Sequence, residues 1–456
     1  TFALWTLEGA AIVWVGLRQK RLLARAFGLA LQIAGAGYFV MKYPTYDLSN
    51  PWWNAFVAGC VIIAAAGFII ARLLHRYRDV IDRRAEPGDA LMVAWAAGWW
   101  ALAGVHALYH ALPGRGFETG FLAFAAVTAL AAELAGARLR WTPLRRAAVL
   151  LPVAMLAALF LEAGRDAHPF AAYGFLAWPC AIALLYVVLR RHENDGIAVL
   201  SEAQHVAGLW ISIVVLTWEG AWQLRAAGAG KVWITAVYAG VPAAALAWVS
   251  GFSTRASWPF GVHYAKVYGL AGLGPIAASL GVWMVYANLA EPGSMRPIPY
   301  LPILNPIDIA HIAVFAALWR WARTVTVLDR SQCIAVLAAF GFLWVNCMLL
   351  RSIHYWAGVA YHWDALSRSV LVQSGFSLLW TATAFVVMRN ATREGRRRLW
   401  MVGAALLGVV VIKLFVNDLS STGTVARIVS FIGVGAGLLL IGYVAPVPPG
   451  DTERPD

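Results

Sequence analysis

The chain has 456 residues, of which 61% are hydrophobic and 13% are charged. A soluble protein carries about a quarter charged residues, so a water-soluble globule could not hide this much apolar surface. The formal net charge of +13 does not by itself indicate nucleic-acid binding, because its location along the chain decides what it contacts. The four cysteines are far apart in apolar runs, which indicates neither a disulfide framework nor a structural zinc site.

Apolar stretches of about twenty residues recur from end to end, and each can cross roughly 30 Å of hydrocarbon. They are continuously apolar, which excludes an alternating transmembrane barrel. We therefore expect an all-α fold, a polytopic transmembrane helical bundle of about 15 helices that occupies 1–445. The expected spans are 2–17, 21–41, 52–74, 88–112, 117–137, 144–163, 169–190, 204–224, 231–250, 264–290, 305–323, 332–350, 366–388, 395–416 and 424–444.

Charge alternates from one connection to the next. Most of the 36 basic residues fall in every second connection, for example 18–25, 72–84, 138–146 and 389–398. Because Lys and Arg concentrate in cytoplasmic loops, these connections are expected inside. The N-terminus of this segment then lies outside, and the C-terminus lies inside with a charged, Pro-rich tail, 446–456, that is expected to be disordered. The basic runs are topology signals and contacts with anionic lipid, and no nucleic-acid partner is expected.

The start of the chain is unusual for this topology. It begins at Thr1, with no initiator Met and no charged, cleavable signal before the first span. An outside N-terminus without a signal predicts that an upstream region is missing. A shortened numbering of a complete protein is the alternative.

Helical hairpins joined by short basic loops are the expected building unit, and a weak repeat of them is visible. At a fixed offset of 375 residues, Leu4-Trp5-Thr6 matches Leu379-Trp380-Thr381, Arg18 matches Arg393 and Gly28 matches Gly403. Identities accumulate by chance in apolar sequence, so duplication and coincidence both stay open. If the repeat is real, the first and last complete hairpins are equivalent units.

Several segments carry a family resemblance. They are Trp5-Thr6-Leu7-Glu8-Gly9-Ala10-Ala11, Leu304-Asn305-Pro306-Ile307-Asp308, Lys413-Leu414-Phe415-Val416-Asn417-Asp418-Leu419 and Arg427-Ile428-Val429-Ser430-Phe431-Ile432-Gly433. With them the chain resembles the bacterial membrane-protein family catalogued as domain of unknown function 2339. The resemblance implies a multi-pass protein of the bacterial inner membrane and a longer parent chain with a soluble N-terminal region. It implies no established reaction.

The outer loop 351–368 holds the richest set of polar residues. Ionisable groups at membrane depth cost several kcal/mol unless paired or hydrated, so each is a functional hypothesis. The loop contains Arg351, His354, His362, Asp364 and Arg368 among Trp and Tyr residues. Imidazoles shuttle protons near neutral pH, and guanidinium groups bind phosphate or carboxylate bidentately. The alternative is an interfacial loop that Trp, Tyr and Arg anchor in lipid.

A second pair stands at the start of an expected helix. Asp308 and His311 are three residues apart and share one helix face, so the carboxylate could orient the imidazole as a general base. The alternative is capping alone, with Asn305 as N-cap, Pro306 at the first helical position and Asp308 complementing the helix dipole.

The last outer turn is bracketed by Lys413, Asp418 and Arg427. Lys413 lies about one turn inside its helix and needs a carboxylate partner, for which Asp418 is nearest in sequence. A structural ion pair and the binding of an anionic headgroup or substrate are the two interpretations.

No metal site and no cofactor are predicted. His106 and His110 share a helix face, but the residues between them include no Glu, and the third ligand, for which Glu118 is the candidate, is conjectural. The acids in apolar runs are expected to form hydrogen bonds between helices, with a proton or substrate path as the alternative; they are Glu8, Glu133, Glu162 and Glu219. Phosphate-binding loops, dinucleotide fingerprints and serine nucleophile elbows do not occur in the sequence.

Three functions stay open. The first is an envelope enzyme that transfers a glycosyl or acyl group from a lipid-linked or amphipathic substrate at the periplasmic face. In that hypothesis Arg351 and Arg368 hold an anionic group, His354 or His362 acts as base, and Asp364 or Asp308 orients it. The second is a transporter or lipid flippase. The third is a non-catalytic scaffold of an envelope assembly, which docks envelope proteins through the missing region. Membrane lipids are expected partners in all three.

Overall fold

The computed structural model describes residues 2–78, 88–112, 114, 116–165, 168–193, 198–295, 299–325, 329–414 and 424–445. All regular elements in this part of the chain are helical, which confirms the expected all-α fold. The predicted disordered tail, 446–456, lies outside it. The elements are α1 (Phe2–Arg18), α2 (Leu22–Met41), η1 (Tyr43–Thr45), α3 (Ala55–Arg76), α4 (Gly88–Ala111), α5 (Gly116–Arg138), α6 (Thr142–Ala147), η4 (Ala148–Leu150), α7 (Leu151–Ala163), α8 (Gly174–His192), α9 (Ala198–Ala226), α10 (Lys231–Ser250), the π-helix η5 (Tyr264–Gly272), α11 (Gly274–Ala290), α12 (Pro306–Ala322), α13 (Arg330–Ala357), α14 (Trp363–Arg368), α15 (Val370–Arg393), α16 (Arg397–Lys413) and α18 (Thr424–Val444).

Each expected span coincides with a helix or with consecutive helices, and most bounds agree within a few residues. Within the described ranges, 10 helices are long and apolar enough to cross a membrane, against about 15 spans expected from the pattern. One difference concerns the predicted outer loop 351–368. Helix α13 continues to Ala357 and ends at Gly358, whose φ of 72° is the left-handed cap that glycine favours. Arg351 and His354 therefore belong to a helix instead of a loop.

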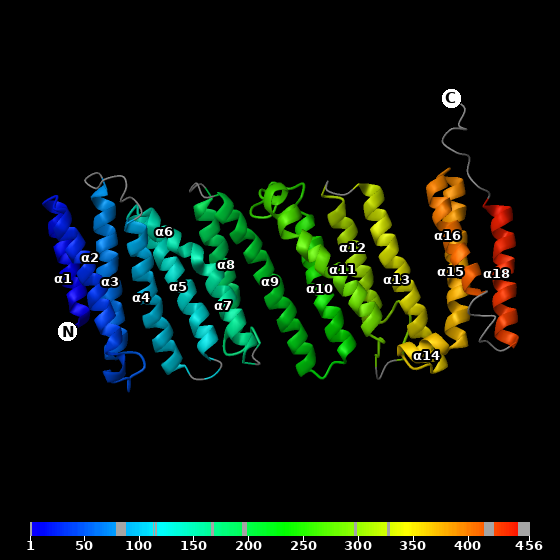
Figure 1. Ribbon diagram of the computed structural model, residues 1–456, viewed down its shortest axis with the longest axis horizontal. Helices are drawn as coiled ribbons and strands as arrows, with labels where there is room; N and C mark the ends of the chain where they lie inside the picture. Colours follow the sequence, from blue (N-terminus) through cyan, green and yellow to red (C-terminus); the bar gives the residue numbers. More distant parts are fainter. Residues whose placement is uncertain are drawn as a thin grey trace, which may run out of the picture. The chain divides into compact units, whose positions relative to one another are not determined.

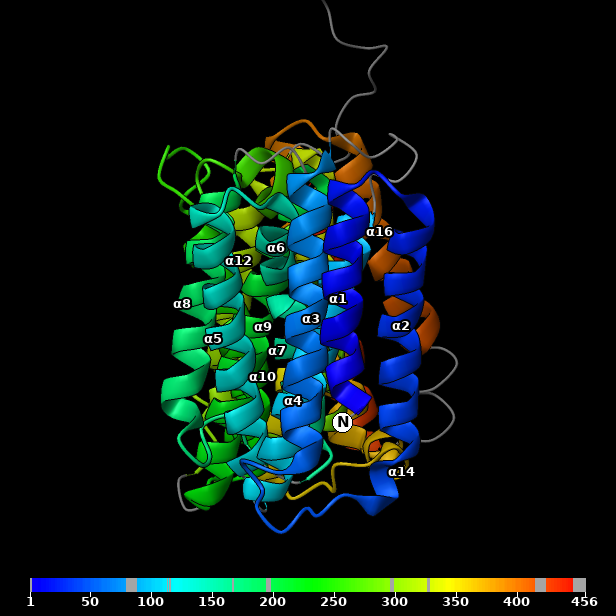
Figure 2. The same ribbon diagram turned by 90° about the vertical axis from the view of Figure 1, so that its left-hand side faces the viewer.

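The chain folds as two compact units, which are described separately. Unit 1 contains 1–223 and 248–275, and unit 2 contains 224–247 and 276–456. In unit 1, helices α1 to α5 run along a common direction in both ribbon views (Figures 1 and 2). In unit 2, α14 lies beside the ends of α13 and α15, where the chain reverses (Figure 1).

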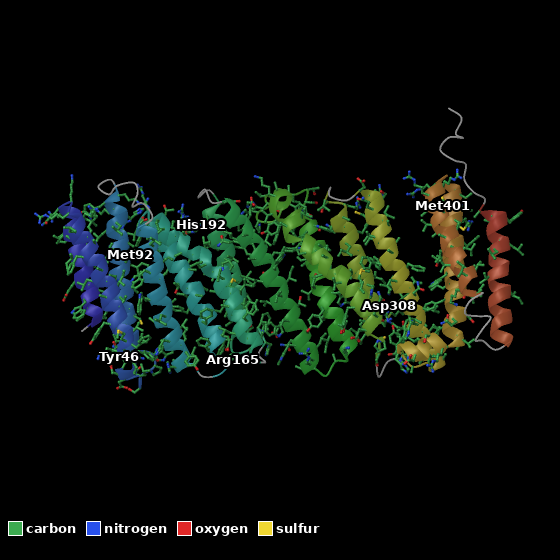
Figure 3. All side chains as sticks on the ribbon, viewed as in Figure 1. Tyr46, Met92, Arg165, His192, Asp308 and Met401 are labelled. Carbon is green, nitrogen blue, oxygen red and sulfur yellow. The ribbon has the colours of Figure 1, made fainter. Side chains whose placement is uncertain are left out.

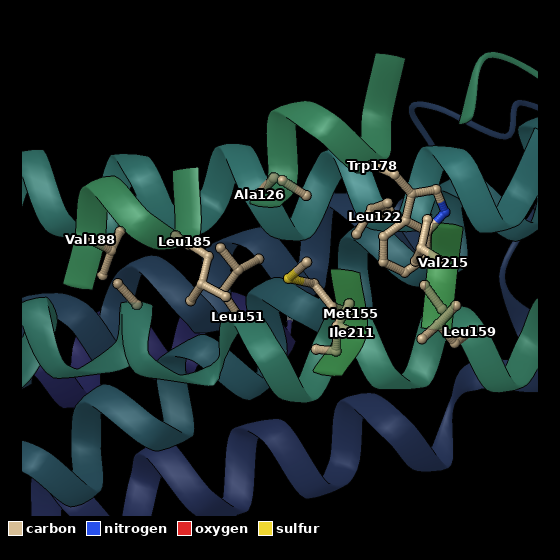
Figure 4. Packing of buried hydrophobic residues seen from close by; sticks show 14 of the residues in the cluster. Leu122, Ala126, Leu151, Met155, Leu159, Trp178, Leu185, Val188, Ile211 and Val215 are labelled. Carbon is tan, nitrogen blue, oxygen red and sulfur yellow. The ribbon is translucent and has the colours of Figure 1, made fainter. Parts of the chain in front are cut away.

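Unit 1 is packed around large apolar side chains from α5, α7, α8 and α9 (Figure 4). Met155, Trp178 and Leu185 have no exposed surface. Lipid tails are as apolar as these side chains, so close van der Waals packing and interhelical hydrogen bonds hold such a core together. Trp178 satisfies its indole N–H by donating to Glu162 Oε1 at 3.2 Å, as expected for a buried acid between helices.

Hairpins α1–α2 and α15–α16 close with the same turn. In each, a residue with left-handed φ follows the first helix, Lys20 at 59° and Gly395 at 65°. The next amide donates to the carbonyl five residues earlier, at 2.9 and 2.8 Å, which is the Schellman closure. A Cβ atom on Gly28 or Gly403 would lie 2.6 or 3.1 Å from a carbonyl of the facing helix. These positions are separated by the same 375 residues at which the sequence identities recur.

Candidate functional site

The start of α12 is built as a cap around Asp308. Asn305 is the N-cap and its Oδ1 accepts from the Asp308 amide at 3.0 Å, with Pro306 at the first helical position. The predicted capping arrangement is therefore confirmed. The Asp308 carboxylate does more than cap, because its Oδ2 accepts from the Asn305 side chain and from the Ile303 amide at 3.0 Å. Ile303 has a φ of 69°, a strained value for a β-branched residue, so this bond holds the loop in place.

Arg351 reaches Asp308 from the last turns of α13. Its Nη1 lies 3.0 Å from Asp308 Oδ1, and both side chains are 0% exposed. The other guanidinium nitrogens are also occupied: Nη2 donates to Asn288 Oδ1 at 3.0 Å and to Ala287 O at 3.1 Å, and Nε donates to Glu291 O at 3.2 Å. Arg351 thus joins the carboxyl end of α11, the start of α12 and α13 in one buried ion pair.

His311 occupies the same buried layer. Its Nε2 lies 2.9 Å from Asn288 Nδ2, and its Nδ1 lies 2.8 Å from Ile307 O. An amide nitrogen donates, so Nε2 is the acceptor and Nδ1 carries the proton, which assigns the neutral tautomer. The ring lies parallel to Trp344, with an interplanar angle of 2° and a centroid distance of 5.7 Å. Both ring nitrogens are therefore in use within the protein.

The predicted Asp308–His311 pair is brought into one network but not into direct contact. The two residues are connected through Asn288 and Arg351. Asp308 Oδ1 also accepts from the Trp344 indole at 2.8 Å. Each nitrogen of the His311 ring and of the Arg351 guanidinium has a hydrogen-bond partner within the protein; we call this a saturated network. These side chains therefore support the helices that carry them.

Two members of this network were missed by the sequence reasoning. Asn288 lies within the apolar run 264–290, where a single amide is the only signal of an interhelical hydrogen bond. Glu291 follows that run, and its Oε1 lies 2.7 Å from Lys231 Nζ and accepts from Thr235 Oγ1 at 3.3 Å. This pair connects the end of α11 to α10.

The remaining residues of the predicted loop lie apart from the buried pair. His354 Nδ1 hydrogen-bonds Val359 O at 2.6 Å, where the chain leaves α13. His362 is the N-cap of α14, and its Nδ1 accepts from the Ala365 amide at 3.4 Å. Asp364 and Arg368 lie on α14 and are exposed, as is His362. The predicted set is therefore divided: Arg351 is buried, His354 is half-buried, and His362, Asp364 and Arg368 are exposed.

Two exposed indoles occur in the same stretch of the chain. Trp363 is 82% exposed and Trp356 is 67% exposed. Tyr361 is half-buried and donates its hydroxyl to Asn288 O at 3.2 Å, so the segment that leads into α14 is connected to the network around Arg351. Burial raises the pKa of Tyr361 to about 12, which keeps this hydroxyl a donor at neutral pH.

The last predicted group is described only in part. Lys413 donates to Gln373 O and to Ser377 Oγ, both at 2.8 Å, so it connects α16 to α15. Asp418 and the side chain of Arg427 lie outside the described residues, and their pairing with Lys413 stays a prediction. Across the described ranges, no group of three or more His, Cys, Asp or Glu side chains is arranged to hold a metal ion.

Together, the apolar helices and buried interhelical ion pairs define a multi-pass helical membrane protein. The chain matches, over residues 1–448, the family described as a predicted membrane protein, DUF2339, and it belongs to that family. No curated protein and no solved structure matches the chain.

Proposed function

We propose that this protein is an enzyme of the bacterial inner membrane that transfers a glycosyl or acyl group from a lipid-borne substrate at the periplasmic face. The observation that carries the proposal is the exposed group at α14: His362 at its N-cap, and Asp364 and Arg368 within the helix, are exposed in the same short segment as the exposed Trp363. Trp side chains favour the headgroup layer, so the group is suited to the boundary where a lipid carrier presents its polar end.

The orientation follows from the distribution of basic residues in unit 2. Arg320, Arg323 and Arg330 flank the end of α12 and the start of α13, and Arg393 and Arg397 flank the turn between α15 and α16. These sites are at the opposite ends of the helices from α14. Because Lys and Arg concentrate on the cytoplasmic side, α14 is assigned to the periplasmic side.

The side chains of α14 have the chemistry that the transfer needs. Arg368 would bind the anionic group of the lipid carrier. The acceptor hydroxyl oxygen would bond to the transferred carbon and pass its proton to His362 or His354. The bond from that carbon to the carrier would break, with its electron pair remaining on the carrier. Asp364 would stabilise the imidazolium that forms.

The buried pair takes a different role from the one the sequence suggested. Arg351 has every guanidinium nitrogen occupied, and His311 has both ring nitrogens occupied. Each of these nitrogens already has a partner within the protein. We therefore assign Asp308, His311 and Arg351 to positioning the end of α13 and, through Tyr361, the start of α14.

Complementation tests the proposal. Cells that lack the gene would receive the wild-type chain, His354→Ala/His362→Ala, Asp364→Ala or, as a matched exposed histidine outside the site, His110→Ala. We expect the site variants to fail with normal amounts of folded protein in the membrane, while His110→Ala restores the wild-type envelope. Full restoration by the double histidine variant would reject the enzymatic role.

A transporter is the second candidate, and the buried charge pair favours it. Asp308 and Arg351 place two opposite charges in the interior of the bundle, where transporters keep coupling groups. A transporter requires this pair to open and close, so Asp308→Asn would abolish transport while leaving a folded protein. An enzyme that uses the pair as support would instead lose stability together with activity.

A further inference from the structure

A second polar site lies in unit 1, at the end where α5 meets α6 and α8 ends. A cavity of about 430 Å³ opens there, lined by Arg140, Arg145 and Arg191 together with Glu133 and Trp141. The volume falls within the range of about 300–1,000 Å³ that is typical of small-molecule sites. His192, which contacts Glu133, is at this end of unit 1, whereas Tyr46 and Arg165 are at the other end (Figure 3).

One wall of the cavity is the turn between α5 and α6, which has the same form as the turns that close α1–α2 and α15–α16. The Trp141 amide donates to Gly136 O at 2.7 Å, and the intervening Arg140 has a left-handed φ of 50°. A Cβ atom on Gly136 would lie 2.8 Å from the Arg145 amide nitrogen and 2.5 Å from its Cγ, so only glycine allows this approach. The α15–α16 hairpin has Gly395 at the left-handed position, the residue that such a turn favours.

The charges in this cavity are not balanced by Glu133. Its buried carboxylate accepts from Arg145 at 3.2 and 3.3 Å and lies 2.6 Å from His192 Nε2. Arg191 Nη1 lies 3.6 Å from the same carboxylate, too far for a strong hydrogen bond. One carboxylate therefore faces three guanidinium groups, and the cavity carries an excess of positive charge.

Two donors at the cavity have no partner in the described part of the chain. Arg140 forms no side-chain ion pair there. Its left-handed φ is strained for any residue with a Cβ atom, whereas glycine would adopt it without strain. Trp141 is 3% exposed, and its indole N–H has no acceptor among the described residues. A buried donor without an acceptor costs stability, so its presence beside the arginines indicates a site for an acceptor-rich ligand.

We propose that this cavity binds a phosphate group, either as the headgroup of an anionic lipid or as a free phosphate ion. Arg140 and Arg191 would contact the phosphate oxygens, since planar guanidinium groups match that geometry. Glu133 would position Arg145 at the cavity wall. Basic pockets between membrane helices are known sites for anionic headgroups.

Lipid retention tests the proposal. The full chain would be reconstituted into nanodiscs of phosphatidylcholine with or without phosphatidylglycerol. It would then be released, and the phosphatidylglycerol molecules that stay bound would be counted by native mass spectrometry. The variant is Arg140→Gly, which relieves the left-handed strain. The matched control is Lys20→Gly, which relieves the same strain at the α1–α2 turn. Both variants are expected to melt above the wild type, so a loss of binding cannot come from misfolding.

We expect the amount of retained phosphatidylglycerol to fall about tenfold in Arg140→Gly and in Arg191→Gln, and to stay at the wild-type level in Lys20→Gly. Inorganic phosphate that displaces the lipid, or binds without it in isothermal titration, would assign the site to free phosphate. Retention that inorganic phosphate does not disturb would assign it to the lipid headgroup. Equal retention by the wild type and both cavity variants, without phosphate binding, would overturn the proposal, as would an equal loss in Lys20→Gly.

Discussion

The Asp308–Arg351 pair offers the most direct test of how unit 2 is held together. Replacing Arg351 with Met keeps the unbranched stem of the side chain and removes its four hydrogen bonds. At about 0.6 kcal/mol for each interhelical hydrogen bond in a membrane, those bonds contribute about 2.4 kcal/mol. The variant also leaves Asp308 buried without a cation, which raises the expected loss to about 3–5 kcal/mol of unfolding free energy.

Unfolding in mixed micelles of mild detergent and SDS measures this loss, with Trp fluorescence as the signal, since Trp344 contacts Asp308 directly. Arg368→Met is the control, because Arg368 is exposed and should cost less than about 0.5 kcal/mol. The double variant Arg351→Met/Asp308→Asn should lose less than the two single variants combined, because both charges are gone. A loss below about 1 kcal/mol in Arg351→Met, or strict additivity, would refute the account of a saturated buried pair.

Three further predictions concern single positions. Ile303→Gly relieves a left-handed φ of 69° and should raise the unfolding free energy by about 0.5–1 kcal/mol in the same unfolding assay; a lower value than the wild type would contradict the strain. Gly136→Ala should cost about 1–3 kcal/mol, because its Cβ meets the Arg145 amide at 2.8 Å, whereas Gly98→Ala, with open space around it, should cost nothing in the same melting assay. Since the pKa of Tyr361 is raised to about 12, its stabilising contribution is complete below about pH 10 and disappears as the pH rises to about 12. Ultraviolet titration of the wild type should therefore show one more late-ionising tyrosine than titration of Tyr361→Phe. If the tyrosine that the variant loses ionises near pH 10, the burial is contradicted.

The membrane fold was largely predictable because the signal is local. Apolar runs of the right length and alternating basic loops depend only on neighbouring residues, so the spans coincide with helices from α1 to α18. The cap at Asn305 and Asp308 was predictable for the same reason. The end of α13 was not, because the Tyr and Trp residues after Arg351 resemble a lipid-anchored loop. The helix instead continues until Gly358 supplies the left-handed cap.

The hydrogen-bond network around Arg351 could not be predicted from the sequence, because its members come from separate helices. Arg351 contacts Asn288 from 63 positions away and Asp308 from 43. No spacing rule connects such residues, and an isolated Asn in an apolar run gives little signal. The sequence grouped Arg351 with His362, Asp364 and Arg368 by proximity along the chain. Arg351 is buried from α13, whereas His362 at the N-cap of α14, and Asp364 and Arg368 within α14, are exposed.

The distance along the chain between Asp308 and Arg351 has a consequence for biogenesis. During synthesis, the carboxylate emerges 43 residues before the guanidinium that neutralises it. Until α13 is made, α12 would enter the lipid with an unpaired charge in its first turn. The cost is lower than the roughly 2.5–3.5 kcal/mol of an Asp at a helix centre, but it still disfavours insertion of α12 alone. Helices α11, α12 and α13 should therefore leave the insertion machinery together, as one preassembled group.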